Sequence, residues 1–204
     1  MIPRENSADG LLVVVSGPSA VGKDTILNEL LSSPNSLRRP VRRCVTTTTR
    51  PPRAEEREGV DYHFVTVPQF HESAQRDGFL EYANVFGNWY GTPRDWVAEQ
   101  RAAGADIILK IDVQGAQAVR ERVPDALLVF FRPPSLEELE RRLRARATEN
   151  EEQIARRLLD ARNELAQISH YDYVVVNDQI EEAIEDMKAI LRAEHCRQAP
   201  AARR

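Results

Sequence analysis

The chain has 204 residues, a formal net charge of -4 at pH 7 and a hydrophobic share of 42%. This length suits one sizeable domain with insertions, and the slight acidic excess argues against a general nucleic-acid binder. Since no apolar run approaches membrane-spanning length, the N-terminus is polar and there are only two isolated cysteines, we expect a cytoplasmic protein without membrane contact or a structural disulfide.

The first predicted element is an apolar strand over residues 11–15, which runs into a glycine-rich stretch and then a helical pattern. Residues 17–23 follow the pattern G-x-x-x-x-G-K, the signature of a phosphate-binding loop when a strand precedes it and a helix follows. The glycines let backbone N–H groups face phosphate oxygens, and the lysine supplies a catalytic cation. We expect ATP to be bound by Gly17, Pro18, Ser19, Ala20, Val21, Gly22, Lys23, Asp24 and Thr25.

One position in this loop is irregular. The pattern calls for Ser or Thr after Lys23, to bind Mg²⁺ through a hydroxyl, and the chain has Asp24 there with Thr25 behind it. A carboxylate is also a good ligand for Mg²⁺, so either Asp24 directly or Thr25 through a water molecule is a candidate metal ligand. The sequence leaves both alternatives open.

Further along the chain, apolar strand candidates alternate with helical patterns. Because strands buried on both faces with crossover helices are typical of parallel sheets, we expect an α/β fold that binds ligands at the carboxyl ends of the strands. Short, turn-separated runs between residues 46 and 91 predict a small mixed or antiparallel β insertion. The other elements are strands over 107–111, 127–131 and 173–176, a helix from Gln114 and a closing helix over 180–191.

A charged, helical stretch interrupts this alternation between residues 135 and 170. Ser135 with Glu138 and Thr148 with Glu151 fit the capping-box pattern, so we expect two helices with a break near Ala147. Such a break makes a hinge possible.

Two blocks between these elements carry the most specific signal. Residues 46–53 read TTTTRPPR and residues 87–92 read GNWYGT, while residues 111–116 read IDVQGA and residues 176–178 read VND. In these blocks the chain resembles guanylate kinases, the enzymes that pass a phosphoryl group from ATP to GMP, and the resemblance covers nearly the whole chain. It implies a P-loop kinase fold with a GMP-binding β insertion and a helical lid, Mg²⁺ as cofactor and dGMP as a second acceptor. The segments implied are a core of residues 10–45, 93–134 and 171–197, a GMP-binding region of 46–92 and a lid of 135–170.

The chemistry of the side chains agrees with that implication. Arginines can clamp a nucleotide phosphate with charge-assisted hydrogen bonds, and tyrosine hydroxyls can assist them. A carboxylate accepts from the N1–H and amino group that guanine presents side by side, whereas adenine has a lone pair at N1. The expected phosphate clamp is Arg50, Arg53, Tyr62 and Tyr90, and the expected guanine acceptor is Glu81.

The resemblance also assigns roles that the residue types alone do not. It implies base or GMP contacts for Thr46, Thr92 and Glu56, and a role in binding GMP and metal for Asp112. It makes Arg146 and Arg157 lid arginines that move onto the triphosphate, with Arg142 as a third candidate. It suggests that Asn177 contacts the adenine of ATP, although a turn-forming Asn-Asp pair is the simpler interpretation. The expected catalytic residues are Lys23, Arg50, Arg146 and Arg157.

The chain departs from the family pattern at three positions. Asp24 replaces a hydroxyl residue, Lys110 replaces an acid, and Ala147 replaces a glycine at the lid break. Lys110 and Asp112 point to the same side of their strand. Because the loop has gained an acid and the strand has gained a base, we expect Asp24 and Lys110 to compensate each other electrically near the metal.

Two other functions remain open at this point. Ribose bisphosphate phosphokinases resemble guanylate kinases and share a G-K-D loop, but they do not require Glu81 or the full block over 46–53. Guanylate-kinase-like scaffold modules bind peptides instead of catalysing, but they tend to lack Lys23 and the lid arginines. The sequence does not indicate an oligomeric state.

Overall fold

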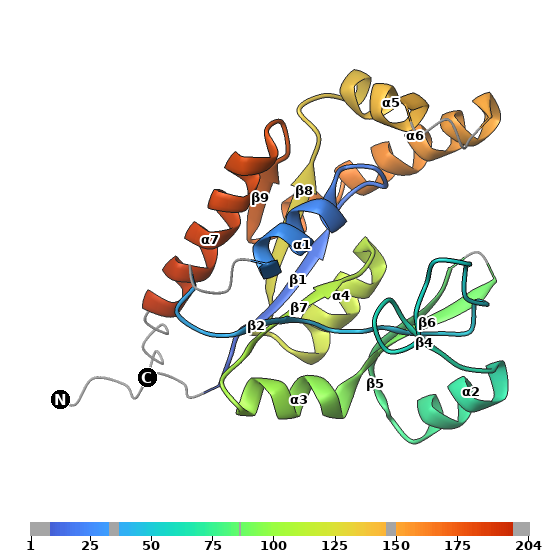
Figure 1. The fold of residues 1–204 in the computed structure, drawn as a ribbon, viewed down its shortest axis with the longest axis vertical. Coiled ribbons are helices and arrows are strands. Elements are labelled where there is room, and N and C mark those ends of the chain that lie inside the picture. The colour runs from blue at the N-terminus through green and yellow to red at the C-terminus, as the bar shows by residue number, and fades with distance from the viewer. Residues whose placement is uncertain (1–8, 33–36, 86, 146–149, 198–204) are drawn as a thin grey trace.

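The computed structural model describes residues 9–32, 37–85, 87–145 and 150–197. Its centre is a five-stranded parallel sheet in the order β2-β7-β1-β8-β9 (Figure 1). The strands are β1 (Leu12–Ser16), β2 (Val41–Arg43), β7 (Asp106–Lys110), β8 (Leu127–Arg132) and β9 (Tyr173–Val176).

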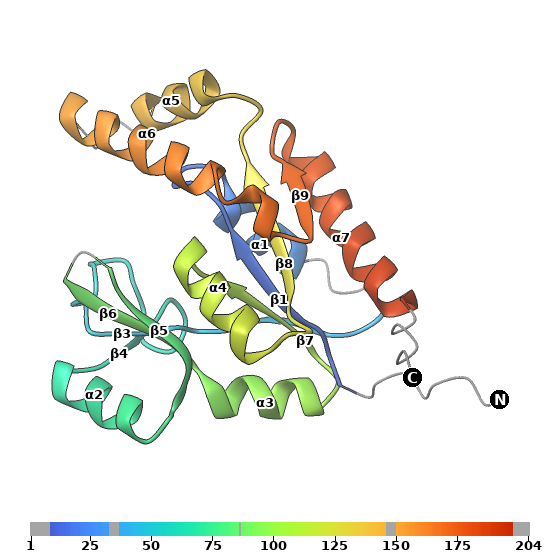
Figure 2. The ribbon, with the colours of Figure 1, turned by 180° about the vertical axis from the view of Figure 1, so that it is seen from behind.

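Helices cover both faces of this sheet (Figures 1 and 2). Alternate residues of β1 point to opposite faces, so Val13 and Val15 pack with one group of helices, and Leu12 and Val14 with the other. The first group is α1 (Lys23–Ser32) and α7 (Ile180–Cys196), and the second is α3 (Arg94–Ala102) and α4 (Val113–Arg122). The two apolar layers hold the sheet between them, and the carboxyl ends of its strands lie together on one side.

Residues between β2 and α3 form a second, four-stranded sheet in the order β4-β3-β6-β5. β3 pairs parallel with β4 and antiparallel with β6, so this sheet is mixed, as the sequence predicts. Phe70 of the covering helix stacks on Phe79 of the sheet, with ring centroids 4.5 Å apart. The elements are β3 (Thr47–Thr48), β4 (His63–Phe64), α2 (Val67–Gln75), β5 (Phe79–Val85) and β6 (Asn88–Pro93).

Two helices, α5 (Leu136–Ala145) and α6 (Glu151–Leu165), project beyond the carboxyl end of the central sheet (Figure 1). They pack on each other through Leu139, Leu143 and Ala161. A short 3₁₀ turn, Ile168–His170, leads from α6 back to β9. The second sheet and these helices therefore face each other across the end of the central sheet.

The strand predictions for the central sheet are confirmed to within one residue, and α5 begins directly after Ser135 as predicted, whereas α6 begins later than the Thr148–Glu151 pattern predicts. The N-cap of α6 is Asn150, which forms a capping box with Gln153; Asn caps as well as Thr does and lies one residue before the helix. Thr148 and the expected break at Ala147 lie outside the described residues. At α5, Ser135 Oγ accepts from Glu138 N, but the Glu138 carboxylate binds Arg141 and Arg142 instead of completing a capping box.

Candidate active site

The phosphate-binding loop connects β1 to α1 and makes close backbone contacts with its surroundings. Gly17 has φ of 140°, and a Cβ there would lie 2.1 Å from the carbonyl oxygen of Phe131. Gly22 has φ of 93°, and a Cβ there would lie 2.4 Å from Asn177 Nδ2. Neither position can carry a larger side chain without moving the loop.

Lys23 folds back over this loop. Its Nζ donates to the carbonyl oxygen of Pro18 at 2.9 Å and to that of Gly17. These carbonyl groups hold the ammonium group beside the place where the loop N–H groups can bind phosphate.

Asn177 lies against the loop just after β9 and is buried. Its Nδ2 donates to the carbonyl oxygen of Val21 at 2.7 Å. The resemblance implies a contact with adenine; among the described residues, Nδ2 supports the loop that carries Gly22, and Oδ1 is buried without a hydrogen-bond partner. Arg142 of α5 is nearby, where its Nη2 donates to the backbone oxygen of Asn177 at 3.1 Å.

Helix α6 contacts the loop directly. Arg157 Nη1 donates to Ser19 Oγ at 2.8 Å. Glu164 lies two turns further along the same helix and hence on the same face. Together with Lys23 and Asp112 it lines a cavity beside the loop. Burial raises the pKa of Glu164, an effect that the charge of Lys23 partly offsets. The other expected lid arginine, Arg146, lies outside the described residues.

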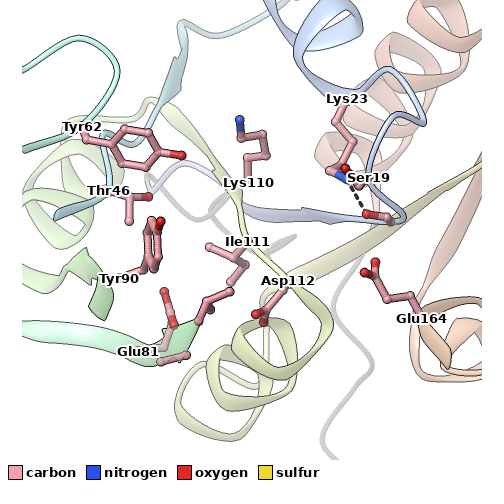
Figure 3. A pocket seen from close by; sticks show the side chains of 13 residues that line it. Ser19, Lys23, Thr46, Tyr62, Glu81, Tyr90, Lys110, Ile111, Asp112 and Glu164 are labelled. Atoms are coloured by element: carbon pink, nitrogen blue, oxygen red, sulfur yellow. Dashed lines mark hydrogen bonds between the residues drawn. The ribbon is translucent and has the colours of Figure 1, made fainter. Parts of the chain in front are cut away.

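A cavity of about 300 Å³ joins the loop to the second sheet (Figure 3). It brings together residues from the loop, from both sheets and from α6, and its lining includes Ala83, Val85, Ile111 and Glu164, to which the sequence analysis assigns no role. The lining residues with expected roles are Gly17, Ser19, Lys23, Thr46, Tyr62, Glu81, Tyr90 and Asp112, and Lys110 also lines it.

Glu81 lines this cavity with only 5% of its surface exposed. Thr92 Oγ1 donates to Glu81 Oε1 at 2.5 Å, which holds the carboxyl group in one orientation. The fit against α4 depends on Gly115, where a Cβ would lie 3.1 Å from Glu81 Oε2. Burial raises the pKa of Glu81 to about 7, and the charge of Asp112 adds to this while the bond from Thr92 opposes it.

Asp112 follows β7 and caps α4. Its Oδ1 accepts from Gly115 N at 2.8 Å, so the cap holds one carboxylate oxygen while the side chain lines the cavity. The cap role follows from its position between a strand and a helix, a signal present in the sequence.

The expected phosphate clamp is arranged around one ion pair. Arg50 Nη2 donates to both carboxylate oxygens of Glu56, at 2.7 and 2.9 Å, and Arg53 N donates to Glu56 Oε2 at 2.9 Å. The Arg50 guanidinium also lies 5.4 Å from the ring centroid of Tyr62, which in turn meets the edge of Tyr90. The bonds between Arg50 and Glu56 raise the pKa of the arginine and lower that of the acid. Tyr62 and Tyr90 line the cavity, whereas the ion pair and Arg53 lie outside its lining.

The two candidate metal ligands in the loop point in different directions. Asp24 Oδ1 accepts from Lys110 Nζ at 2.5 Å and lies 3.6 Å from Arg43 Nη1. Thr25 lines a separate cavity of about 370 Å³ beside Ile180 and Ile184 of α7. The structure therefore does not bring Thr25 to the candidate site.

The candidate site combines a glycine-rich loop, which follows a central parallel strand, with a cavity that reaches a second, mixed sheet. The family model described as guanylate kinase matches residues 10–194. The chain belongs to the guanylate kinase family. Within the family it is 48% identical over 190 residues to the guanylate kinase of Myxococcus xanthus, covering 92% of this chain and 88% of the relative. It is 47% identical over 192 residues to that of Symbiobacterium thermophilum, covering 94% and 89%.

A solved guanylate kinase structure from Anaplasma phagocytophilum has the same fold. It superposes with a TM-score of 0.75 at 34% identity, covering 93% of this chain and 88% of that one. Guanylate kinases are phosphotransferases that phosphorylate GMP with ATP. In the described part of the chain, no helix is long and apolar enough to cross a membrane. Among those same residues, no three His, Cys, Asp or Glu side chains cluster as metal ligands.

Proposed function

We propose that this guanylate kinase family member transfers the terminal phosphoryl group of Mg²⁺-bound ATP to GMP or dGMP in the cavity between the phosphate loop and the second sheet. The observation that carries this is the pairing of two features in one cavity. Lys23 lies at one end, and the buried Glu81 lies at the other (Figure 3). Thr92 Oγ1 donates to the Glu81 carboxylate. A donor triphosphate and an acceptor guanine can therefore be held within reach of each other.

On the acceptor side, ionised Glu81 accepts hydrogen bonds from guanine N1–H and the amino group, with Thr46 and Thr92 as further contacts to the base. Adenine presents an acceptor at N1 and is rejected, because both carboxylate and ring nitrogen would then lack a proton. The acceptor phosphate is bound by Arg50, Arg53, Tyr62 and Tyr90. For this, the Arg50 side chain turns from Glu56 towards the phosphate.

On the donor side, Lys23 exchanges the carbonyl oxygens of Pro18 and Gly17 for phosphate oxygens. Arg157 leaves Ser19 for the transferring group, joined by Arg146. Neutralising the charge that spreads over this group, in a site closed to water, is what phosphoryl transfer requires, and no covalent enzyme intermediate is needed.

The donor base has a candidate place of its own. A second cavity, of about 550 Å³, also borders the phosphate loop and is lined by Ala20, Gly22, Arg142, Asn177 and Asp178. Since loop residues line both cavities, a triphosphate bound along the loop can reach from one to the other. The contact of Asn177 with adenine that the sequence suggests is then indirect, through the loop that its amide supports.

The cofactor expected for this reaction is Mg²⁺, and the donor chemistry near the loop fits it. Asp112 has one carboxylate oxygen outside its capping bond, and hard oxygen ligands of this kind suit Mg²⁺, which takes its remaining ligands from phosphate oxygens and water. When bound, Mg²⁺ neutralises charge on the donor phosphates. We assign Asp112 as the protein group closest to it, since Lys110 and Arg43 hold Asp24 and Thr25 lines another cavity.

The test is a coupled assay of ADP formation from Mg²⁺-ATP, with GMP, dGMP, AMP and ribose 1,5-bisphosphate offered separately. Turnover with GMP and dGMP, and not with AMP, is the expected result. Turnover with ribose 1,5-bisphosphate alone would contradict the acceptor assignment, and no turnover with any acceptor would contradict the enzymatic function.

A further inference from the structure

Asp24 occupies an unusual place for an acid. It lies in the first turn of α1, directly after Lys23, at the helix end that the phosphate loop presents to its ligand. A helix N-terminus attracts anions, but an uncompensated carboxylate beside it repels a triphosphate. With 62% of its side chain exposed, Asp24 is not removed from the ligand by burial, so its charge needs another form of compensation.

That compensation comes from two neighbouring strands of the central sheet. Lys110, the last residue of β7, donates from Nζ to Asp24 Oδ1 at 2.5 Å, and Arg43, the last residue of β2, lies 3.6 Å from the same oxygen. Both cations are more enclosed than the acid, with 29% and 23% of their side chains exposed. Partial burial by itself raises the pKa of Asp24, but Lys110, Arg43 and Lys23 outweigh it and lower the pKa.

We propose that Lys110 is a positioning residue of the phosphate loop, which neutralises Asp24 and so allows a loop with an acid after its lysine to accept a nucleoside triphosphate. The inference rests on the proposed function only in taking ATP as the donor. It also gives one account of both departures that the resemblance indicates, at positions 24 and 110, because the acid at one position is neutralised by the lysine at the other.

A competing role for Lys110 is a direct contact with phosphate, since its side chain also lines the cavity with Thr46 and Tyr62 (Figure 3). The two roles differ in what they require of Asp24. A direct contact contributes to affinity whatever residue stands at position 24, whereas a compensating charge matters only while the acid is present.

The experiment is a double-mutant cycle on nucleotide affinity, with ADP and ATP binding measured by calorimetry in Mg²⁺ and again in EDTA. We expect Lys110→Met to weaken ATP binding about tenfold. Asp24→Asn should change affinity by about twofold or less, and the double variant should return to within about twofold of the unchanged protein. Lys110→Arg should retain ATP affinity, because it keeps the positive charge beside Asp24.

Lys188→Met is the matched control, because it makes the same chemical change at an ion pair with Glu185 within α7. Circular dichroism and thermal unfolding establish that each variant folds, and Lys110→Gln replaces Lys110→Met if the latter does not. Equal losses from Lys110→Met with Asp24 and with Asn at position 24 would overturn the proposal in favour of a direct phosphate contact. A loss from Asp24→Asn that occurs only in Mg²⁺ would overturn it in favour of a metal ligand. Because these measurements need no acceptor, failure of the GMP assay leaves their outcome readable.

Discussion

At the scale of single residues, Glu81 is the side chain on which the choice of acceptor depends. Replacing it with Gln keeps the size but puts an N–H where guanine also presents donors. We expect Glu81→Gln to lower kcat/KM for GMP about 100-fold, equivalent to roughly 3 kcal/mol, because a donor faces a donor in a buried site. The KM for ATP should change little. Steady-state kinetics with each nucleotide varied in turn measures both effects.

Glu72→Gln makes the same change at an exposed ion pair between Glu72 of α2 and Arg76, which directly follows that helix, and serves as the control. It should leave both KM values unaltered. If Glu81→Gln impaired ATP and GMP equally, the carboxylate would not be the guanine acceptor.

The raised pKa of Glu81 gives a second prediction at this scale. In the protein without GMP, the pKa of the Glu81 carboxyl is about 7. GMP affinity should therefore fall as the pH drops below about 7, by up to about tenfold per pH unit. This part of the pH dependence should disappear in Glu81→Gln. Calorimetric titrations with GMP, over about three pH units around that pKa, measure the effect in both proteins. The same profile in both would contradict a role for the ionised carboxylate.

The same pKa predicts an effect on stability with a defined sign. The folded-state pKa of about 7 exceeds the ordinary value of 4.5, so the folded protein holds the proton more tightly than the unfolded chain. The stabilisation this provides is complete below pH 4.5 and is lost as the pH rises to about 7. Glu81→Gln should therefore gain stability relative to the unchanged protein over that range, as urea unfolding at both ends of it would show.

At the scale of elements, the contact between α6 and the phosphate loop is the decisive one. Arg157 reaches Ser19 across 138 positions of the chain. We expect Arg157→Ala to lower kcat about 100- to 1,000-fold, because arginines that neutralise the transferring phosphoryl group contribute at about that level or above. KM for GMP should change far less, and pre-steady-state kinetics separates the chemical step from product release.

Arg162→Ala is the control on the same helix, where the side chain is exposed. It should retain full activity. An Arg157→Ala variant with unaltered kcat would show that this arginine only holds the lid against Ser19.

At the scale of the whole molecule, a contact between a histidine and a buried carboxylate joins α7 to β7 at the end of the central sheet opposite the site. His195 near the end of α7 lies 2.7 Å from Asp106 Oδ2 at the start of β7, and Asp106 Oδ1 accepts from Leu11 N at 2.9 Å. Asp106 is only 2% exposed. We expect His195→Ala to lower the free energy of unfolding by about 1–3 kcal/mol, because it leaves a buried carboxylate oxygen without its partner.

Urea unfolding measures this loss, and kinetics should show no change in either KM, since the contact lies at the amino ends of the strands. His170→Ala, at an exposed position in the 3₁₀ turn before β9, is the control for stability. A large change in kcat with unaltered stability would contradict a purely structural role for His195.

Much of the architecture can be predicted because its signals are local. Short apolar runs are enough to indicate the central strands, and the spacing of Gly17, Gly22 and Lys23 is enough to indicate the phosphate loop. Strand β2 and helix α3 were not predicted, because their local signals are weak. Strand β2 has 3 residues, and among the residues of α3 only Val97 is buried, so neither element shows a clear hydrophobic periodicity.

The sequence by itself determined the family, the fold class and the residue types expected to meet the nucleotides, because these follow from short motifs of neighbouring residues. Only the tertiary structure decided which of these residues share a space. Lys110 and Asp24 are 86 positions apart, and Asn177 reaches Val21 across 156. Thr25, although adjacent to Asp24, lines a cavity other than the one that holds Lys23 and Glu81. Contacts of this kind depend on which strands lie side by side and on helical phase, and sequence spacing alone does not specify either.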